Sequence, residues 1–541
     1  MRHGGKILID QLKIQGVNRV FCLPGESYLA VLDGLFDSGI KTIIGRQEGG
    51  VAMMAEAHGK LTGNPGVAFV TRGPGATNAS AGVHIALQDS TPMILFVGQV
   101  ASDQRDREAF QEVDYRQMFA PLAKWVAEID RVDRIPEYIS RAFHIAVAGR
   151  PGPVVLALPE DILAQQFDVL DAKPAQPACQ DVSEASVQNV LAQVQRAENP
   201  ILIVGGGAWS AKTAKDLASF AAALNLPVAT SFRCQDYIDN RHPNYAGDLG
   251  IAANPALLSR IKSADCLLVL GARMGEMTTG GYELLEIPNP SQAMIHIHSD
   301  ANEIGRVYRP HLGLACTASQ FVGKALKMLR AAPAARQDSP EHKAYKAWQV
   351  PYATPGAAQL EQVILHLSNT LSDDAILTNG AGNYAGWLHR YFCYKEYRTQ
   401  LAPTSGSMGY GLPAAVSAKL AYPKRAVVCL AGDGCFQMTM QEFGTAIHYG
   451  VNIIVIVVNN GVYGTIRMHQ QKAYPDRPSG TEICNPDFAA LARSYGGFGA
   501  TITKTDQFAA AFAAALAAKA PAILDVQTDP LAVTTRSSTA S

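Results

Sequence analysis

The sequence predicts an α/β protein with three doubly wound parallel-sheet domains. Apolar runs of strand length alternate with alanine-rich helical stretches almost from one end of the chain to the other, a pattern typical of parallel α/β architecture. Several of the apolar runs end at glycine turns, at the strand ends where open α/β sheets bind ligands. A chain of 541 residues has room for about three domains.

The composition is that of an ordinary globular protein. Hydrophobic residues make up 48% of the chain and charged residues 17%, and the formal net charge is -1. This balance gives no electrostatic reason to expect a nucleic acid or an anionic membrane as a partner.

Two features predict a cytoplasmic protein without a membrane segment. The N-terminal residues lack a long apolar segment, and no apolar stretch reaches the roughly 18 to 20 residues that span a membrane. The nine cysteines are scattered without the CxxC spacing of metal sites, which suits a reducing compartment.

Two polar, proline-bearing segments divide the chain. They are residues 168–181 and 331–341, and both have the composition of linkers. Domains near residues 1–165, 185–330 and 355–530 follow.

The third domain contains the most informative pattern. Residues 425–430 form an apolar run before Gly432-Asp433-Gly434, and residues 451–458 form a second run that ends at Asn459-Asn460. We expect two strands there, joined by a helix over residues 436–449. Because the carboxyl ends of parallel strands meet at one edge of a sheet, the carboxylate and the amides can share one ligand. Oxygen ligands of these types suit Mg²⁺ that is shared with a diphosphate, and glycine lets the backbone approach that anion.

The first domain repeats this order. We expect a strand at residues 66–70, a glycine-rich turn at 72–75, a helix at 76–88 and a second strand at 92–97. The first and third domains are therefore predicted to be related.

A second candidate site lies in the first domain, where Arg46-Gln47-Glu48-Gly49-Gly50 precedes a small, apolar helical stretch. A glutamate at the start of a helix is usually a favourable partner of the helix dipole. A catalytic role for Glu48 depends on which cofactor the protein binds.

The middle domain shows strand-like runs that lead into glycine turns at residues 201–210 and 264–275. A glycine turn after a strand can cradle a nucleotide phosphate, but neither segment has the GxGxxG spacing. Such turns also occur in doubly wound sheets without a nucleotide, so both interpretations stay open.

The spacing of GDG and NN resembles the thiamine diphosphate binding motif, and the resemblance extends over nearly the whole chain. The matching segments are FCLPGE (21–26), RQEGG (46–50), GPGATN (73–78), AFQEVD (109–114), GSMGYGLPAA (406–415), GDGCFQM (432–438) and NNGVYG (459–464). The chain resembles the thiamine diphosphate-dependent enzyme superfamily, in the branch of acetolactate synthase catalytic subunits.

The resemblance implies roles for the three domains and for particular residues. The domains would be pyrimidine-binding, central Rossmann-like and diphosphate-binding. Glu48 would be the catalytic carboxylate beside the cofactor's pyrimidine ring, and Gln111 and Lys124 match positions that line the substrate channel. Asp433, Asn460 and the carbonyl of Val462 would hold Mg²⁺. The remaining cofactor-binding positions would be Asn383, Gly406, Met408, Gly432, Gly434, Cys435, Tyr463 and Gly464, with Met408 as the apolar wedge that bends the cofactor.

The function that the resemblance implies is decarboxylation of a small-molecule 2-oxo acid with carboligation to a second carbonyl compound. A homodimer would be the minimum assembly, with a homotetramer as the usual outcome. The alternative is a 2-oxo acid decarboxylase or 2-hydroxyacyl lyase without carboligation, because Met277 stands where the family has an arginine that holds the second keto acid. Intact Glu48 and GDG segments argue against a catalytically silent paralogue.

Retention of FAD, which the family's central domain binds, is doubtful. His298 stands where an acidic residue is expected, and residues 244–255 differ from the family's methionine-rich segment. A flavin-dependent oxidase of the same superfamily is a further alternative.

Overall fold

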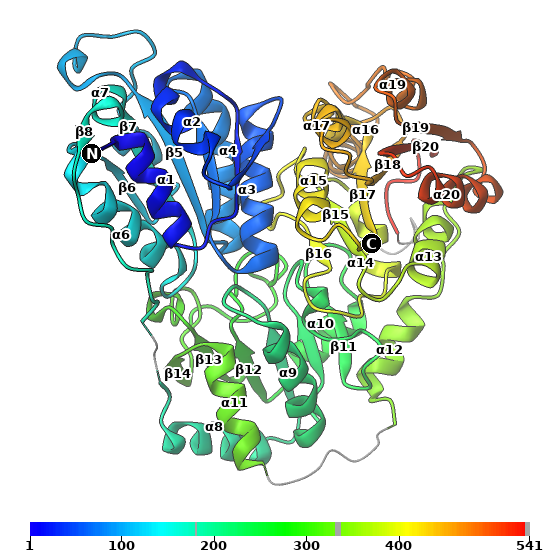
Figure 1. Cartoon of the computed structure of the whole chain (residues 1–541). Helices are drawn as coiled ribbons and strands as arrows, with labels where there is room; N and C mark the ends of the chain where they lie inside the picture. Colours follow the sequence, from blue (N-terminus) through cyan, green and yellow to red (C-terminus); the bar gives the residue numbers. More distant parts are fainter. Residues whose placement is uncertain (179–180, 330–336, 536–541) are drawn as a thin grey trace. The chain divides into compact units, whose positions relative to one another are not determined.

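A computed structural model describes residues 1–178, 181–329 and 337–535. Within these residues the chain forms three parallel sheets of six strands each, together with a short antiparallel pair, β1 (Arg2–His3) and β8 (Gln166–Phe167) (Figure 1). Parts of the two predicted linkers, at residues 179–180 and 331–336, lie outside the described residues.

The N-terminal sheet has the strand order β3-β2-β4-β5-β7-β6. Its strands are β2 (Arg19–Cys22), β3 (Lys41–Ile44), β4 (Gly66–Val70), β5 (Met93–Gln99), β6 (Trp125–Glu128) and β7 (Pro153–Pro159). The helices of this part are α1 (Gly4–Ile14), α2 (Leu29–Phe36), α3 (Glu48–Thr62), α4 (Pro74–Asp89), α5 (Tyr115–Phe119), α6 (Ile135–Val147) and α7 (Glu160–Ala164). Helices α1, α2 and α6 share one buried apolar core with the sheet. Helices α3 and α4 approach so closely that a Cβ atom on Gly82 would lie 2.4 Å from the Cβ atom of Ala52.

The central sheet has the order β11-β10-β9-β12-β13-β14, which is that of a Rossmann domain. Its strands are β9 (Pro200–Val204), β10 (Val228–Thr230), β11 (Tyr245–Asp248), β12 (Cys266–Leu270), β13 (Ala293–His298) and β14 (Leu312–Ala315). The helices around it are α8 (Glu184–Arg196), α9 (Ala211–Leu224), α10 (Pro255–Lys262), α11 (Ala318–Met328) and α12 (Pro340–Trp348).

The C-terminal sheet has the order β16-β15-β17-β18-β20-β19. Its strands are β15 (Ile376–Asn379), β16 (Gln400–Leu401), β17 (Val427–Gly432), β18 (Ile454–Asn459), β19 (Phe498–Ile502) and β20 (Ala522–Gln527). The helices are α13 (Leu360–Thr370), α14 (Ala385–Tyr391), α15 (Gly411–Ala421), α16 (Asp433–Gln437), α17 (Glu442–His448), α18 (Gly464–Ala473), α19 (Phe488–Ser494) and α20 (Phe508–Ala517).

The N-terminal and C-terminal sheets have the same topology. If the strands of each sheet are counted along the chain, both sheets have the second strand at one edge, then the first, third, fourth, sixth and fifth. The predicted fold class of three doubly wound parallel sheets is therefore confirmed, and the expected relation between the first and third parts extends to the full strand order.

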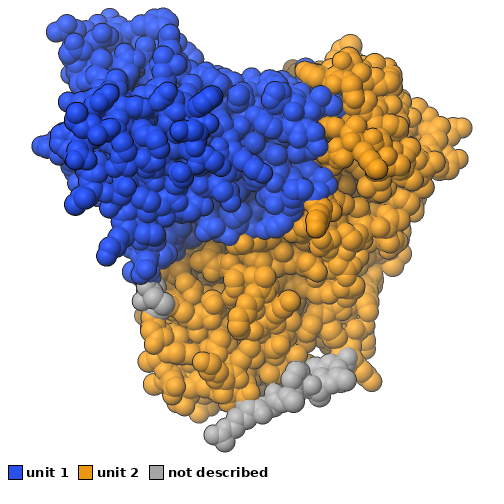
Figure 2. All heavy atoms as spheres, in the orientation of Figure 1, with its two compact units in different colours: residues 1–178, 412–423, 439–451 blue, residues 179–411, 424–438, 452–541 orange. Residues whose placement is uncertain are grey.

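Contacts along the chain group the described residues into two compact units, which Figure 2 colours separately. Unit 1 contains residues 1–178 together with 412–423 and 439–451, and unit 2 contains the rest. The predicted limits near residues 165, 185 and 355 stay predictions. The grouping differs from three contiguous domains because most of α15 and all of α17 pack with the N-terminal part.

The helix predicted over residues 436–449 is wrong in its extent. The structure has α16, which ends at Gln437, and α17, which begins at Glu442. The interruption falls where the chain passes from unit 2 to unit 1. Periodicity cannot reveal such a break, because most residues of both helices are buried and neither has a polar face to mark its limits.

Candidate active site

Asp433 lies at the carboxyl end of β17, where it begins α16, and its side chain is buried. Strand β17 pairs in parallel with β18, and Gly432 is paired with Val458. The turn after β18 therefore lies beside Asp433, as the sequence predicts for neighbouring parallel strands.

Four hydrogen bonds orient the Asp433 carboxylate. Oδ1 accepts one from the backbone N–H of Gly434 at 2.7 Å. Oδ2 accepts from the backbone N–H groups of Gly461 at 2.8 Å and Asn460 at 3.2 Å, and from Nδ2 of Asn485 at 2.7 Å. Each carboxylate oxygen has more than one lone pair, so an oriented carboxylate can also bind a cation.

Asn460 and Val462 lie in the same turn. Oδ1 of Asn460 accepts a hydrogen bond from the backbone N–H of Val462 at 3.2 Å. The short bridge between Val462 and Glu482 fixes this segment further. One carboxylate, one amide oxygen and one backbone carbonyl are hard oxygen donors, so these residues fit Mg²⁺.

Neighbouring side chains leave no room for a Cβ atom at three of the predicted cofactor-binding glycines. A Cβ atom at Gly434 would lie 2.6 Å from the Tyr463 ring, and one at Gly464 would lie 2.9 Å from Nδ2 of Asn383. A Cβ atom at Gly432 would lie 2.9 Å from the Tyr384 ring. These glycines let backbone and side chains converge on the Asp433 turn.

Cys435, Asn383 and Met408 border the same turn. Sγ of Cys435 accepts a hydrogen bond from the backbone N–H of Gly409 at 3.2 Å, which attaches the residue that follows Met408 to α16. Asn383 donates through Nδ2 to the carbonyl of Val533 at 2.9 Å. Met408 is half-buried against the C-terminal core, and Gly406 has a φ of 70°. The structure thus brings together all the predicted site residues of unit 2.

Asn485 is a residue of this site that no motif in the sequence indicates. This side chain donates to Asp433 and also to Oδ1 of Asn459 at 2.8 Å, and it accepts from Nε2 of Gln437 at 2.8 Å. Asn459 in turn donates to Asp525. Burial raises the pKa of Asp525 above its usual value, and the hydrogen bond from Asn459 offsets part of that rise. In the sequence, Asn485-Pro486 indicates only a turn.

Replacing Asn485 by Ala is expected to weaken Mg²⁺-dependent cofactor binding by about 10- to 100-fold, because outer partners orient a metal ligand. The affinity for thiamine diphosphate, measured by calorimetry over a series of Mg²⁺ concentrations, checks this. The exposed Asn189 on α8 provides the control, since its replacement by Ala should leave the affinity unchanged. An Asn485→Ala protein that binds like the wild type would contradict this role.

Glu48 is the first residue of α3 and is buried. Gln47 caps the helix, since its Oε1 accepts a hydrogen bond from the backbone N–H of Gly50 at 3.2 Å. Oε2 of Glu48 accepts from Nδ2 of Asn78 on α4 at 3.0 Å. A cofactor ring nitrogen could therefore share a proton with a carboxylate that is already oriented.

Gln111 lies against the turn that precedes α4. A Cβ atom at Gly73 would lie 2.8 Å from the Cβ atom of Gln111, and one at Gly75 would lie 3.5 Å from Oε1 of Glu48. The backbone N–H of Gly73 donates to the hydroxyl of Tyr115 at 2.8 Å. Glu48 and Gln111 thus border one glycine turn.

Lys124 is not brought together with Glu48. Its Nζ donates to the carbonyls of Ile145 at 2.5 Å and Ala148 at 2.6 Å, at the C-terminal end of α6. It precedes β6, whereas Glu48 follows β3, so the two residues lie at opposite edges of a parallel sheet. A substrate role for Lys124 stays a prediction, and this geometry favours a structural one.

The glycine turn after β9 has a structural explanation. A Cβ atom at Gly206 would lie 1.9 Å from the carbonyl oxygen of Gly271, and Nε1 of Trp209 donates to the Gly205 carbonyl at 2.9 Å. The glycines let the ends of β9 and β12 meet. They give no independent support for a phosphate site.

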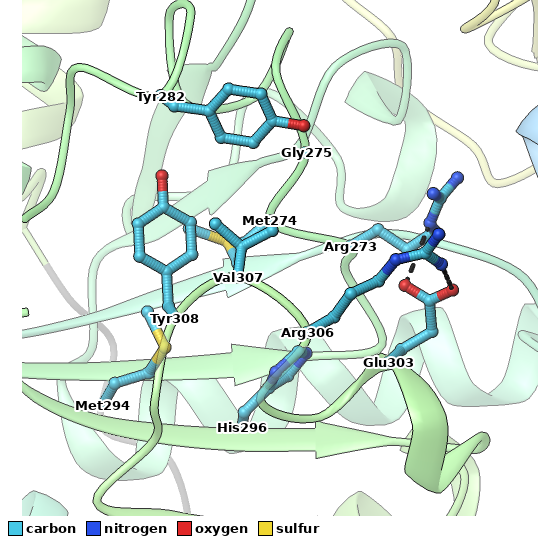
Figure 3. A pocket seen from close by; sticks show the side chains of 10 residues that line it. All are labelled: Arg273, Met274, Gly275, Tyr282, Met294, His296, Glu303, Arg306, Val307 and Tyr308. Carbon is cyan, nitrogen blue, oxygen red and sulfur yellow. Dashed lines mark hydrogen bonds and ion pairs between the residues drawn. The ribbon is translucent and has the colours of Figure 1, made fainter. Parts of the chain in front are cut away.

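A pocket of about 120 Å³ lies beside β12 and β13 (Figure 3). Glu303 lies between Arg273 and Arg306, at 3.2 Å and 2.9 Å, and forms an ion pair with each. Burial lowers the pKa of His296 to about 4, so its ring is neutral near pH 7. The pocket is smaller than the roughly 300 to 1,000 Å³ of sites that enclose drug-sized ligands. This pocket alone is therefore too small to enclose FAD.

Met277 and His298, the two residues that differ from the family's expected arginine and acidic residue, lie in different environments. Met277 is exposed in the loop that follows β12. His298 is buried, and its Nδ1 accepts a hydrogen bond from the backbone N–H of Asp300 at 3.0 Å.

Three models of thiamine pyrophosphate enzyme domains match the chain; thiamine pyrophosphate is thiamine diphosphate. The N-terminal TPP binding domain matches residues 2–118, the central domain 187–325, and the C-terminal TPP binding domain 380–526. The chain belongs to the thiamine pyrophosphate enzyme family. The family prediction is thereby confirmed, as is the prediction of a thiamine diphosphate-dependent enzyme.

Relatives within the thiamine pyrophosphate enzyme family are similar over nearly their full length. The chain is 31% identical to acetolactate synthase isozyme 2 large subunit of Escherichia coli (strain K12), covering 98% of this chain and 96% of that protein. It is 32% identical to the acetolactate synthase large subunits of Parasynechococcus marenigrum (strain WH8102) and of Haemophilus influenzae, covering 87% and 90% of those proteins. None of the helices in the described part of the chain has the length and apolar character needed to cross a membrane.

Proposed function

We propose that this enzyme decarboxylates a 2-oxo acid on thiamine diphosphate and joins the fragment to a second carbonyl compound, as an acetolactate synthase does. The observation that carries the proposal is the near full-length similarity to acetolactate synthase large subunits in a chain that has both a buried Glu48 and a buried Asp433. These relatives favour carboligation over simple decarboxylation.

The cofactor supplies a thiazolium carbon that becomes nucleophilic and an electron sink for loss of CO₂. Glu48 would share a proton with the pyrimidine ring through its carboxylate, and Asn78 keeps that carboxylate oriented. Asp433, Asn460 and the Val462 carbonyl would hold Mg²⁺ against the diphosphate.

The other predicted residues would shape the cofactor site. The backbone around Gly432, Gly434, Cys435, Tyr463 and Gly464 would approach the diphosphate, and Asn383 would donate to it. Met408 would press on the cofactor, and the Gly406 carbonyl would accept from its amino group. Gln111 would border the substrate. The proposed reaction uses neither Lys124 nor FAD.

The assembly that we propose is at least a homodimer, with a tetramer as the family's usual outcome, in which the pyrimidine-binding part of one subunit faces the diphosphate-binding part of another. The proposed location is the cytoplasm. Sedimentation velocity of the loaded enzyme at its assay concentration should show dimers or tetramers. An active monomer would contradict this assembly.

The first functional experiment is to incubate the protein with thiamine diphosphate, Mg²⁺ and pyruvate, without FAD, and to identify products by NMR. Acetolactate is the expected product. Acetaldehyde alone would instead indicate a decarboxylase, and no consumption with any 2-oxo acid tested would contradict the proposal.

A further inference from the structure

A buried glutamate from the C-terminal part of the chain lies against the turn that presents Glu48. Glu442 is the first residue of α17 and is completely buried, within the segment 439–451 that belongs to unit 1. The proposed chemistry at Glu48 and Asp433 does not involve this side chain. In the sequence it is the one charged residue between Phe436 and Ile447.

The Glu442 carboxylate binds the backbone immediately before Glu48. Its Oε1 accepts hydrogen bonds from the backbone N–H groups of Arg46 and Gln47, both at 3.1 Å. Its Oε2 accepts from the hydroxyl of Thr445 at 2.7 Å. Residues 46 and 47 connect β3 to α3, so these bonds fix the point from which the helix and Glu48 start.

The glycines beside Glu48 make room for this carboxylate. A Cβ atom at Gly50 would lie 2.5 Å from Oε1 of Glu442, and one at Gly45 would lie 3.5 Å from Oε2. Gly50 is inside α3 and does not have a positive φ, so its backbone does not require glycine. The space that Glu442 occupies explains a glycine at this position.

Other hydrogen bonds attach residues 412–423 and 439–451 to the N-terminal residues of unit 1. The hydroxyl of Tyr449 accepts from the backbone N–H of Ile44 at 2.7 Å and donates to the Thr42 carbonyl at 3.1 Å, along the edge strand β3. The hydroxyl of Ser417 donates to the carbonyl of Met54 in α3 at 2.8 Å. Glu442 is therefore held in place independently of Glu48.

Burial and hydrogen bonding have opposite effects on the charge of Glu442. Burial raises the pKa of Glu442, and the hydrogen bonds from Thr445, Arg46 and Gln47 act in the opposite direction. A carboxylate at the start of α3 is also favourable with respect to the helix dipole.

We propose that Glu442 is a positioning residue, which holds the Arg46–Gln47 turn so that the Glu48 carboxylate is set for its proton transfer. The inference rests on the proposed role of Glu48. A displacement of about 1 Å at a reacting group can cost on the order of 100-fold in rate, so loss of this support should be visible in kcat.

The test compares Glu442→Ala and Glu442→Gln with Glu361→Ala. Glu361 is a matched control, because it is also completely buried and accepts from a backbone N–H and a hydroxyl, both of Thr354 at 2.8 Å, in the C-terminal part. Gly50→Ala leaves the Glu442 carboxylate in the protein but places a methyl group in the space that this carboxylate occupies.

The first readout is amide hydrogen exchange of the protein without cofactor. Glu442→Ala and Gly50→Ala should raise exchange in peptides that cover residues 44–50, and Glu442→Gln should restore most of the protection, since an amide oxygen still accepts. Glu361→Ala should not raise exchange in those peptides. Unchanged exchange in both Glu442→Ala and Gly50→Ala would overturn the inference.

The second readout is the exchange rate of the thiazolium C2 proton of bound thiamine diphosphate, measured by NMR without a keto acid. Glu442→Ala should slow it by up to about 100-fold, with a similar loss in kcat and a much smaller change in KM. Glu442→Gln should recover most of the rate, and Glu361→Ala should leave the rate unchanged. Combining Gly50→Ala with Glu442→Ala should add little to the loss, because both act on one contact.

The outcomes separate this inference from the proposed function. Normal C2 exchange in Glu442→Ala, with slow exchange in Glu48→Gln, would overturn only the positioning role. Normal exchange in Glu48→Gln would overturn the role of Glu48 and this inference with it. Because C2 exchange requires no keto acid, the readout does not depend on the substrate.

Discussion

Glu48→Gln is expected to lower kcat by about 100- to 10,000-fold, the range for loss of a general acid–base group. The amide can still hydrogen-bond to Asn78 and keeps the side chain's shape, but it cannot exchange a proton with the pyrimidine ring. Thiamine diphosphate and Mg²⁺ should still bind, because the proposed metal site lies around Asp433. Steady-state rates measure the loss in kcat, and calorimetric titration of thiamine diphosphate measures whether the cofactor still binds.

The control for this change is Glu137→Gln, an exposed glutamate on α6 whose replacement should leave kcat unchanged. A Glu48→Gln enzyme with wild-type turnover would disprove the catalytic assignment. Lost cofactor affinity would instead show that Glu48 acts mainly in binding.

Asp433→Ala is expected to lower Mg²⁺-dependent affinity for thiamine diphosphate by more than about 100-fold, because loss of an outer partner alone can cost that much. The change removes a proposed ligand and also the acceptor for the backbone N–H groups of Gly434, Asn460 and Gly461. Cofactor titration with and without Mg²⁺ measures the loss.

Asp433→Asn separates the two effects. It keeps the shape and one acceptor oxygen but loses the charge, so the fold should survive while metal affinity falls. Replacing the exposed Asp506 by Ala should change neither property. Wild-type cofactor affinity in Asp433→Asn would argue that Asp433 is a structural residue of the turn.

Much of the fold could be predicted because strand runs and glycine turns are local signals. The sequence predicts strand β4 at its observed residues, and Gly73-Pro74-Gly75 lies just after it, as Gly432-Asp433-Gly434 lies at the end of β17. Periodicity could not reveal the break between α16 and α17, because such a pattern carries no information on the contacts that α17 makes with residues almost 400 positions away in sequence.

Only part of the candidate site can be predicted from the sequence, because only part of it belongs to local motifs. The unit 2 residues belong to segments with a recognisable spacing, and the structure brings them to one turn. Asn485 and Glu442 act through contacts to Asp433 and Arg46 that only the tertiary structure creates. Lys124 matched a family position, but its ammonium group binds carbonyls at the end of α6.

The composition of unit 1 has a consequence for how the protein acquires its structure during synthesis. Residues 1–178 leave the ribosome long before residues 412–423 and 439–451, which complete the same compact unit. Domains often fold as they emerge, but here the turn before Glu48 cannot receive the Glu442 carboxylate until more than 440 residues have been made. The start of α3, which carries Glu48, is thus completed late, after the central sheet and strands β15 to β17 of the C-terminal sheet have been translated.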